Sequence, residues 1–280
     1  MQQSLWTSLS ALQSSLSWLN RASNNVANQN TPGFAADTGS FADTLTQAMS
    51  GRATALDNAN RYTPQGWWGG TGVASLKNEK DFSQMPINQT GNPTDLALQG
   101  NGFFVVQGDN GQMELTKAGN FGWSQQANGS FVLATPAGQA VLDVNGKPIT
   151  APASAGVAGT QHFSVAPDGQ VTFGKTAGQG QVQGQTGQKI AIADVFLPAE
   201  NLSSVGNNAY VAAAGAQPVI LNRTASAPSS SIVQGALSMS NVDLTVSLTD
   251  LIQAQNMFTL NSEAFQLTNR MLGDANTIRK

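Results

Sequence analysis

A leucine repeat near the N-terminus constrains the fold more than any other feature of the chain. Successive leucines lie four or three residues apart, in the series Leu5, Leu9, Leu12, Leu16 and Leu19. This heptad spacing gathers apolar side chains on one face of an α-helix, and Val26 extends one row of the stripe. Pro32 and Gly33 then end the helix. The segment is therefore predicted to be an amphipathic helix with a long contact face.

The C-terminal segment repeats this pattern. Apolar residues seven apart form one row: Leu244, Leu251, Phe258, Phe265 and Leu272. Ser240 or Asn241 is expected to cap the helix, and Asp243 suits its first turn. A second row starts at Leu248 and continues with polar residues, namely Gln255, Ser262 and Asn269. Since that row is a poor core for an isolated helix pair, we expect the helix to need more neighbours than its own chain offers.

The centre of the chain, from about residue 96 to 211, has the pattern of a β domain. Asn-Gly or Asp-Gly dipeptides, which favour hairpin turns, start at positions 110, 128, 145 and 168. The apolar stretches "FFVVQ" and "SFVLAT" beside the first two are typical of strands. We predict a mainly β central domain flanked by N- and C-terminal helices. Because the two helices share one repeat, we expect them to pair as a coiled-coil layer.

The same patterns divide the chain into five segments. We predict an N-terminal assembly helix and hinge, an extended connector, a β-rich domain, a second connector and a C-terminal assembly helix. Their predicted ranges are 1–34, 35–75, 76–211, 212–239 and 240–280.

The composition excludes several classes of function. A net charge of -3 and a charged fraction of 10% give no reason to expect a nucleic-acid partner. The absence of cysteine excludes disulfides, thiolate metal sites and cysteine nucleophiles. No apolar run is long enough for a membrane span. The first residues lack the basic start and clustered apolar core of a signal peptide, so we expect any export to proceed without a cleaved signal.

No motif indicates chemistry. The single histidine, His162, lies beside a turn and has no second histidine as a partner for metal binding. A Gly-x-Gly before "FFVVQ" is not followed by a helix, so it is not a dinucleotide loop. We therefore predict no catalytic, cofactor-binding or metal-binding residues, no cofactor and no enzyme activity. The carboxylates with possible catalytic roles are scattered, mostly at turns: Asp95, Asp109, Glu114, Asp143 and Asp168.

Four blocks of the sequence carry a family likeness. "NNVANQNTPGF" resembles the asparagine-rich signature of the flagellar basal-body rod and hook proteins. "TDLALQGNGFFVVQ" and "TKAGNFGWSQQANGSFVLATPAGQAVL" are similar to the β domain of that family. The segment that starts with "SNVDLTVSLTDLIQ" resembles its C-terminal helix. The blocks follow the family's order and span nearly the whole chain.

The resemblance implies a structural subunit of the rod that polymerises helically into a hollow tube and transmits torque. It implies self-association, other rod and hook proteins and the flagellar type III export apparatus as partners. It places the protein in the basal body, outside the cytoplasmic membrane. Two features depart from the family pattern: Ala35 stands where a basic residue is common, and the C-terminal helix has few charges.

The asparagine-rich signature is interpreted as a hinge at the base of the first helix. Asparagine tolerates turn conformations and bonds nearby backbone groups. We expect Asn24, Asn25 and Asn28 to end the helix and to bond a neighbouring subunit, and Phe34 to fill an apolar pocket. With the two apolar rows, these residues form the predicted assembly interface.

Two other functions remain open at this point. A secreted β-rich binding module or adhesin would use Trp67 and Trp68 as a ligand platform, and an enzyme would act on cell-wall glycan. Neither needs heptad repeats at both ends of its chain, so the repeats favour the rod protein.

Overall fold

A computed structural model describes most of the chain. The described residues are 2–43, 46–49, 67–70, 72–75, 79–108, 111–126, 129–151, 163–173, 188–213, 215–216, 218–221 and 230–278. They confirm the predicted fold class in its coarse form, because one long helix lies at each end and the centre is mainly β.

The chain divides into two compact units. One, the helical unit, comprises Met1–Ala27, Asp37–Glu79 and Asp243–Lys280, and the other, the β unit, comprises Asn28–Ala36 and Lys80–Val242. The division passes through two short strands, β1 (Ala36–Thr38) and β6 (Glu79–Asp81).

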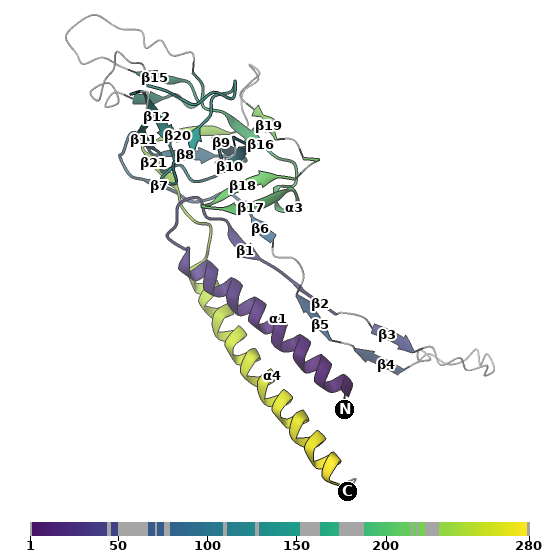
Figure 1. Ribbon diagram of the computed structural model, residues 1–280. Helices are drawn as coiled ribbons and strands as arrows, with labels where there is room; N and C mark the ends of the chain where they lie inside the picture. Colours follow the sequence, from purple (N-terminus) through teal and green to yellow (C-terminus); the bar gives the residue numbers. More distant parts are fainter. Residues whose placement is uncertain are drawn as a thin grey trace, which may run out of the picture. The chain divides into compact units, whose positions relative to one another are not determined.

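Two long helices dominate the helical unit, α1 (Gln2–Ala27) and α4 (Leu244–Ile278). They lie side by side and run in opposite directions, so the two chain ends are at the same end of the pair (Figure 1). The expected cap of α4 was wrong. The Asp243 carboxylate accepts hydrogen bonds from the backbone N–H groups of Thr245 and Val246, because the helix begins one residue after Asp243.

Strand pairs complete the helical unit. In antiparallel arrangement, β2 (Phe41–Asp43) pairs with β5 (Val73–Ser75), and β3 (Thr46–Met49) pairs with β4 (Trp67–Gly70). The segment 35–75, predicted as an extended connector, therefore contains paired strands. Phe41, Thr46 and Val73 in these strands are residue types that favour strands.

One large sheet forms the body of the β unit. Among the described residues its main path runs in the order β11-β12-β13-β9-β10-β18-β17, and β16 pairs with both β9 and β19. The strands are β9 (Phe103–Gln107), β10 (Met113–Thr116), β11 (Gly122–Gln125), β12 (Phe131–Ala134), β13 (Ala140–Val141), β16 (Ile192–Asp194), β17 (Leu202–Gly206), β18 (Ala209–Ala212) and β19 (Val219–Ile220). The one-turn helix α3 (Pro198–Asn201) precedes β17.

The continuous apolar run of β9 is explained by burial on both of its faces. Phe104 and Val106 belong to one apolar cluster with Leu96, Leu133 and Ile192. Phe103 and Val105 belong to a second cluster. Since side chains alternate along a strand, β9 lies between two cores.

The β unit also contains shorter strand pairs. The pairs are β8 (Leu96–Gln99) with β20 (Ser231–Gln234), β7 (Ile87–Gln89) with β21 (Ala236–Ser238), and β14 (Phe163–Val165) with β15 (Val171–Phe173). The last part of the predicted connector 212–239 is thus strand, and it buries Ile232 and Ala236.

The described glycines of the predicted turns adopt the backbone conformation that such turns need. Gly146 and Gly169 have φ values of 75° and 90°, and their N–H groups bond the carbonyls of Asp143 and Ala166. Gly111 and Gly129 have positive φ as well. Their preceding residues, Asn110 and Asn128, lie outside the described residues.

We expect the β unit to fold by itself. A fragment of residues 80–242 keeps both apolar clusters and should unfold cooperatively in urea, because small single domains usually do. Joining residues 28–36 to it through a linker should add roughly 1.5–3 kcal/mol, the range for burying a side chain such as Phe34. Replacing Phe34 with alanine in the longer fragment is the control, and a gradual transition in both fragments would contradict the division.

Candidate assembly interface

The N-terminal leucines fall on two different faces of α1. A row of half-buried apolar residues alternates with small residues, and together they form the inner row of α1: Leu5, Ser8, Leu12, Ser15, Leu19, Ala22 and Val26. Ser15 and Ala22 are buried. Leu9 and Leu16 lie outside this row and are 38% and 43% exposed.

The inner row of α4 also mixes large and small residues. Its members, four and three apart, are Ser247, Leu251, Ala254, Phe258, Asn261, Phe265, Thr268 and Leu272. Ser247 and Ala254 are buried and the others half-buried. Leu244, the first residue of the predicted row, is 40% exposed.

The predicted second row of α4 is mostly exposed, as expected of a row that is a poor core for an isolated helix pair. Leu248, Gln255 and Asn269 are exposed and Ser262 is half-buried, whereas buried small residues start one position earlier, at Ser247. Small side chains allow two helix backbones to approach closely, so they occupy the contact and leave larger residues outside it. The amide of Asn261 donates to the Ser15 hydroxyl at 3.0 Å and joins the two inner rows.

A second face of α1 bonds the strand β5. The Ser14 hydroxyl donates to the Val73 carbonyl at 3.1 Å, and the Val73 N–H donates to the Ser10 hydroxyl at 3.4 Å. These serines satisfy backbone groups of a strand edge that would otherwise lack partners. The serine content of α1 is thereby explained in part.

The asparagines at the end of α1 bond their own chain. The Asn25 side chain donates to the Asp37 carbonyl at 2.9 Å and accepts from the Asp37 N–H at 2.8 Å. Asn24 donates to the Asp37 carboxylate, and Asn28 accepts from the Thr31 hydroxyl. The border between the two units falls inside this motif, between Ala27 and Asn28. The role of these asparagines in contacts with another subunit stays a prediction.

The end of the motif is anchored in the β unit. Gly33 has a φ of 70°, and a Cβ atom there would lie 2.2 Å from the backbone nitrogen of Ala118, so glycine is required. Its N–H donates to the Ser238 carbonyl at 2.8 Å. Phe34 is 5% exposed, and the Lys80 ammonium lies 4.3 Å from the centre of its ring. Phe34 therefore fills a site in its own chain.

Asn241 ties together the segments by which the chain enters and leaves the β unit. Its side-chain oxygen accepts from the Ala36 N–H at 2.8 Å, and its amide donates to the Asp81 carbonyl and the Ser83 hydroxyl. The unit borders lie next to these residues, after Ala36, before Lys80 and after Val242. Asn241 was predicted as a helix cap. Its side chain instead links segments of the β unit that are far apart in the sequence.

Comparisons with known proteins match part of the β unit and the C-terminal helix. A family model described as the flagellar hook protein FlgE/F/G D1 domain matches residues 97–173, and one described as the flagellar basal body rod FlgEFG protein C-terminal matches residues 233–278. The chain is 29% identical over 281 residues to the flagellar basal-body rod protein FlgG of Bacillus subtilis, and the match spans 100% of both chains. The chain is thus similar along its whole length to flagellar basal-body rod proteins.

Other relatives differ in how much of their length is similar to this chain. FlgG of Borreliella burgdorferi is 27% identical over 280 residues, again with 100% of both chains. The flagellar hook protein FlgE of Helicobacter mustelae is 36% identical over 137 residues, which are 47% of this chain and 29% of the relative. None of these names describes an adhesin. The side chains of Trp67 and Trp68 and all of His162 lie outside the described residues.

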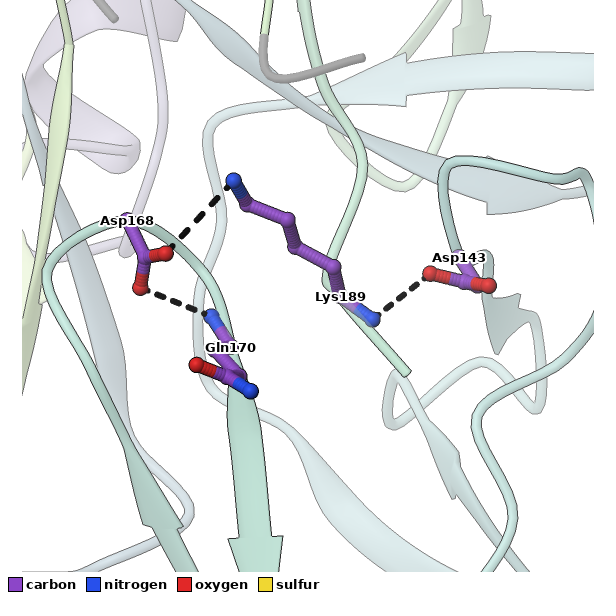
Figure 2. Close-up of polar contacts among 4 residues, drawn as sticks. All are labelled: Asp143, Asp168, Gln170 and Lys189. Carbon is purple, nitrogen blue, oxygen red and sulfur yellow. Dashed lines mark hydrogen bonds and ion pairs between the residues drawn. The ribbon is translucent and has the colours of Figure 1, made fainter. Parts of the chain in front are cut away.

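The described carboxylates that were candidates for glycan hydrolysis form hydrogen bonds within the β unit. Asp143 accepts the Lys189 N–H at 2.7 Å, and Asp168 accepts the Gln170 N–H and lies 3.5 Å from the Lys189 ammonium (Figure 2). Asp95 accepts from Thr90 and Asn92, and Glu114 from Gln139. Asp109 lies outside the described residues. Within the described ranges no group of three metal-binding side chains occurs.

Sequence reasoning missed a buried lysine in the β unit. Lys117 is 5% exposed, its ammonium donates to the Phe82 carbonyl at 2.7 Å, and it lies 5.4 Å from the centre of the Phe103 ring. Burial lowers the pKa of Lys117 from 10.5 to about 8, and the charges of Asp81 and Asp194 offset part of this effect. In the sequence, "LTKAG" gives no sign that this lysine is inside.

Lys117 should make the β unit more stable at alkaline pH. Because its pKa is about 8 in the folded state and 10.5 otherwise, the unfolded state binds more protons between these values. Stability should therefore rise with pH across this window, by at most roughly 3 kcal/mol. The measurement is urea unfolding at pH 7 and pH 10. The free energy of unfolding should rise between these pH values in the native chain and rise less in Lys117→Met. The exposed Lys147→Met is the control, and equal pH dependence in both variants would contradict the assignment.

Proposed function

We propose that this chain is a structural subunit of the bacterial flagellar rod that assembles helically with copies of itself and transmits torque. The proposal includes contacts with other rod and hook proteins and no catalytic activity. It also includes export through the flagellar type III apparatus without a cleaved signal, to a position outside the cytoplasmic membrane. No helix among the described residues is apolar and long enough to cross a membrane.

The observation that carries the proposal is the apolar surface that the helix pair leaves uncovered. Six large apolar residues of α4 are more than 45% exposed: Val246, Ile252, Met257, Leu260, Leu267 and Met271. Trp6 on α1 is 68% exposed. Apolar surface of this extent on one pair of helices is typical of an interaction site. Pairing of α1 and α4 as a coiled coil, extended by neighbouring subunits, would cover it.

Isolated basal bodies test the proposed function. Deleting the gene should abolish motility and leave rods that lack this subunit in electron micrographs, and the wild-type gene should restore both. Mass spectrometry of purified basal bodies should detect the chain. Normal swimming of the deletion strain, with no chain in wild-type basal bodies, would refute the proposal.

A further inference from the structure

We propose that a cavity in the β unit binds small apolar aldehydes or ketones and that the Lys117 amine bonds them covalently as an imine. The ligand class is a neutral carbonyl compound with an apolar chain. This inference goes beyond the proposed rod function and does not depend on it, because every residue that lines the cavity belongs to the β unit of one chain.

The cavity that Lys117 lines has a volume of about 480 Å³. Sites that hold small organic ligands commonly have volumes of about 300–1,000 Å³. The Lys117 ammonium lies 5.4 Å from the centre of the Phe103 ring and 6.0 Å from the centre of the Phe82 ring, and both of these residues also line the cavity. An apolar ligand in the cavity would therefore contact aromatic rings next to an amine.

Lys117 has hydrogen-bonding capacity left over at this place. An ammonium group has three N–H donors, and one of them bonds the Phe82 carbonyl at 2.7 Å. Among the described residues, Lys117 forms no second hydrogen bond and no ion pair. Because a buried cation without a close anion is costly, loss of a proton lowers that cost. The site therefore favours the neutral amine, which is the form that attacks carbonyl carbon.

Exposed apolar residues line the same cavity. Phe196 and Leu197 are 82% and 51% exposed. Leu197 has a φ of 48°, a left-handed conformation that costs energy in any residue other than glycine. The Asn201 amide donates to the Phe196 carbonyl at 2.7 Å, and the Glu200 N–H donates to the Leu197 carbonyl, so local bonds hold this conformation. Strained backbone is concentrated at functional sites, and here it keeps two apolar side chains beside both solvent and the cavity.

Imine formation at Lys117 needs no reactant besides the carbonyl compound. The ammonium loses one proton, and the nitrogen lone pair attacks the carbonyl carbon. The carbonyl oxygen then leaves as water with that proton and one amine proton, and a C=N bond replaces the C=O bond. The product is an iminium cation that retains one N–H, and this N–H can keep the bond to the Phe82 carbonyl.

The charged residues that line the cavity suit a neutral ligand and a cationic product. They are Lys80, Asp81, Lys117 and Asp194. The Lys80 ammonium is held by the Ala35 carbonyl at 3.2 Å. The charges of Asp81 and Asp194 favour the cationic form of Lys117, and they stabilise an iminium in the same way. An anionic ligand would be repelled by these two carboxylates, so the cavity selects neutral carbonyl compounds.

Burial makes Lys117 more reactive than an ordinary lysine at pH 8. It lowers the pKa of Lys117 to about 8, so about half of these amines are neutral at that pH, against about 0.3% for a pKa of 10.5. A less basic amine is also a weaker nucleophile, which offsets part of the gain. The expected net advantage in rate is about tenfold.

Reductive trapping of the full-length chain tests the site. The purified native chain is incubated at pH 8 with hexanal and sodium cyanoborohydride, which reduces the iminium to a stable secondary amine. Digestion with chymotrypsin and mass spectrometry then give the rate of hexyl addition at each lysine. Lys117 should react about tenfold faster than the exposed Lys147, and this ratio should fall to about one in concentrated urea.

A polar aldehyde and two variants provide the controls. With glyceraldehyde the ratio of Lys117 to Lys147 should be roughly threefold lower or less, because a polar chain gains little from apolar walls. Ala199→Trp fills part of the cavity and should slow the labelling of Lys117 severalfold, whereas Glu200→Trp, at the exposed next position, should not. Urea unfolding checks that both variants keep a folded β unit.

Four results would each refute the site. They are equal rates at Lys117 and Lys147, an equal ratio for hexanal and glyceraldehyde, a ratio that persists in urea, and unchanged labelling of a folded Ala199→Trp variant. Because the labelling uses purified single chains, absence of the chain from basal bodies would refute the rod function alone.

Discussion

Replacing Phe258 or Leu12 with aspartate is expected to abolish motility while the β unit remains folded. Both residues belong to inner rows and are half-buried in the contact between α1 and α4. A carboxylate there would have to leave water without a cationic partner, which costs several kcal/mol. Because these rows belong to the helical unit, the urea transition of the β unit should change by less than about 0.5 kcal/mol.

Thr259→Asp is the matched control for Phe258→Asp. It places the same charge one residue further along α4, at an exposed position. Swimming on soft agar and the amount of chain in basal bodies are the measurements. If the Phe258 and Leu12 variants swim like the wild type, the inner rows are not part of the assembly interface.

Hydrogen exchange of the free subunit is expected to be fast in α4 and slow in the central strands of the β unit. Among the described residues of α4, only Ser247 and Ala254 are buried. Helical stability in proteins comes mostly from tertiary packing, and one neighbouring helix offers little of it here. β9, in contrast, is buried on both faces. We expect its amides to exchange about a thousandfold more slowly than those of α4.

Assembly should slow hydrogen exchange in the two helices. Each side chain such as Leu260 or Leu267 that becomes buried contributes roughly 1.5–3 kcal/mol, but each ordered residue costs about 1–2 kcal/mol, so many residues must act together. Exchange in purified rods should therefore slow along the whole length of α1 and α4. Equal protection of α4 in the free and assembled states would show that neighbouring subunits do not stabilise it.

The sequence predicted the helices and the β centre because periodicity and turn chemistry are local signals. The spacing of the leucines and the Asn-Gly and Asp-Gly turns need no knowledge of distant residues. The second contact row of α4 could not be identified in this way. Leu248 attracted attention as a large apolar residue, but the close helix contact uses Ser247 and Ala254, whose small size carries no periodic apolar signal.

Long-range partners account for the other differences. Asn25 was recognised as a turn former, but its bond to Asp37 depends on how the chain folds back. Lys117 has an ordinary sequence context, and only the packing of Phe82 and Phe103 around it explains its burial. The strand character of 231–238 depends on β7 and β8, which lie far earlier in the sequence.

The hydrogen bonds of the Asn241 side chain hold the ends of the β unit close together. Because one side chain bonds Ala36, Asp81 and Ser83, the points where the chain enters and leaves this unit lie next to one another. A segment whose two ends are adjacent can be replaced by a larger or smaller one without stretching the flanking chain. The same pair of terminal helices can therefore carry a central module of a different size without any change in the helices themselves.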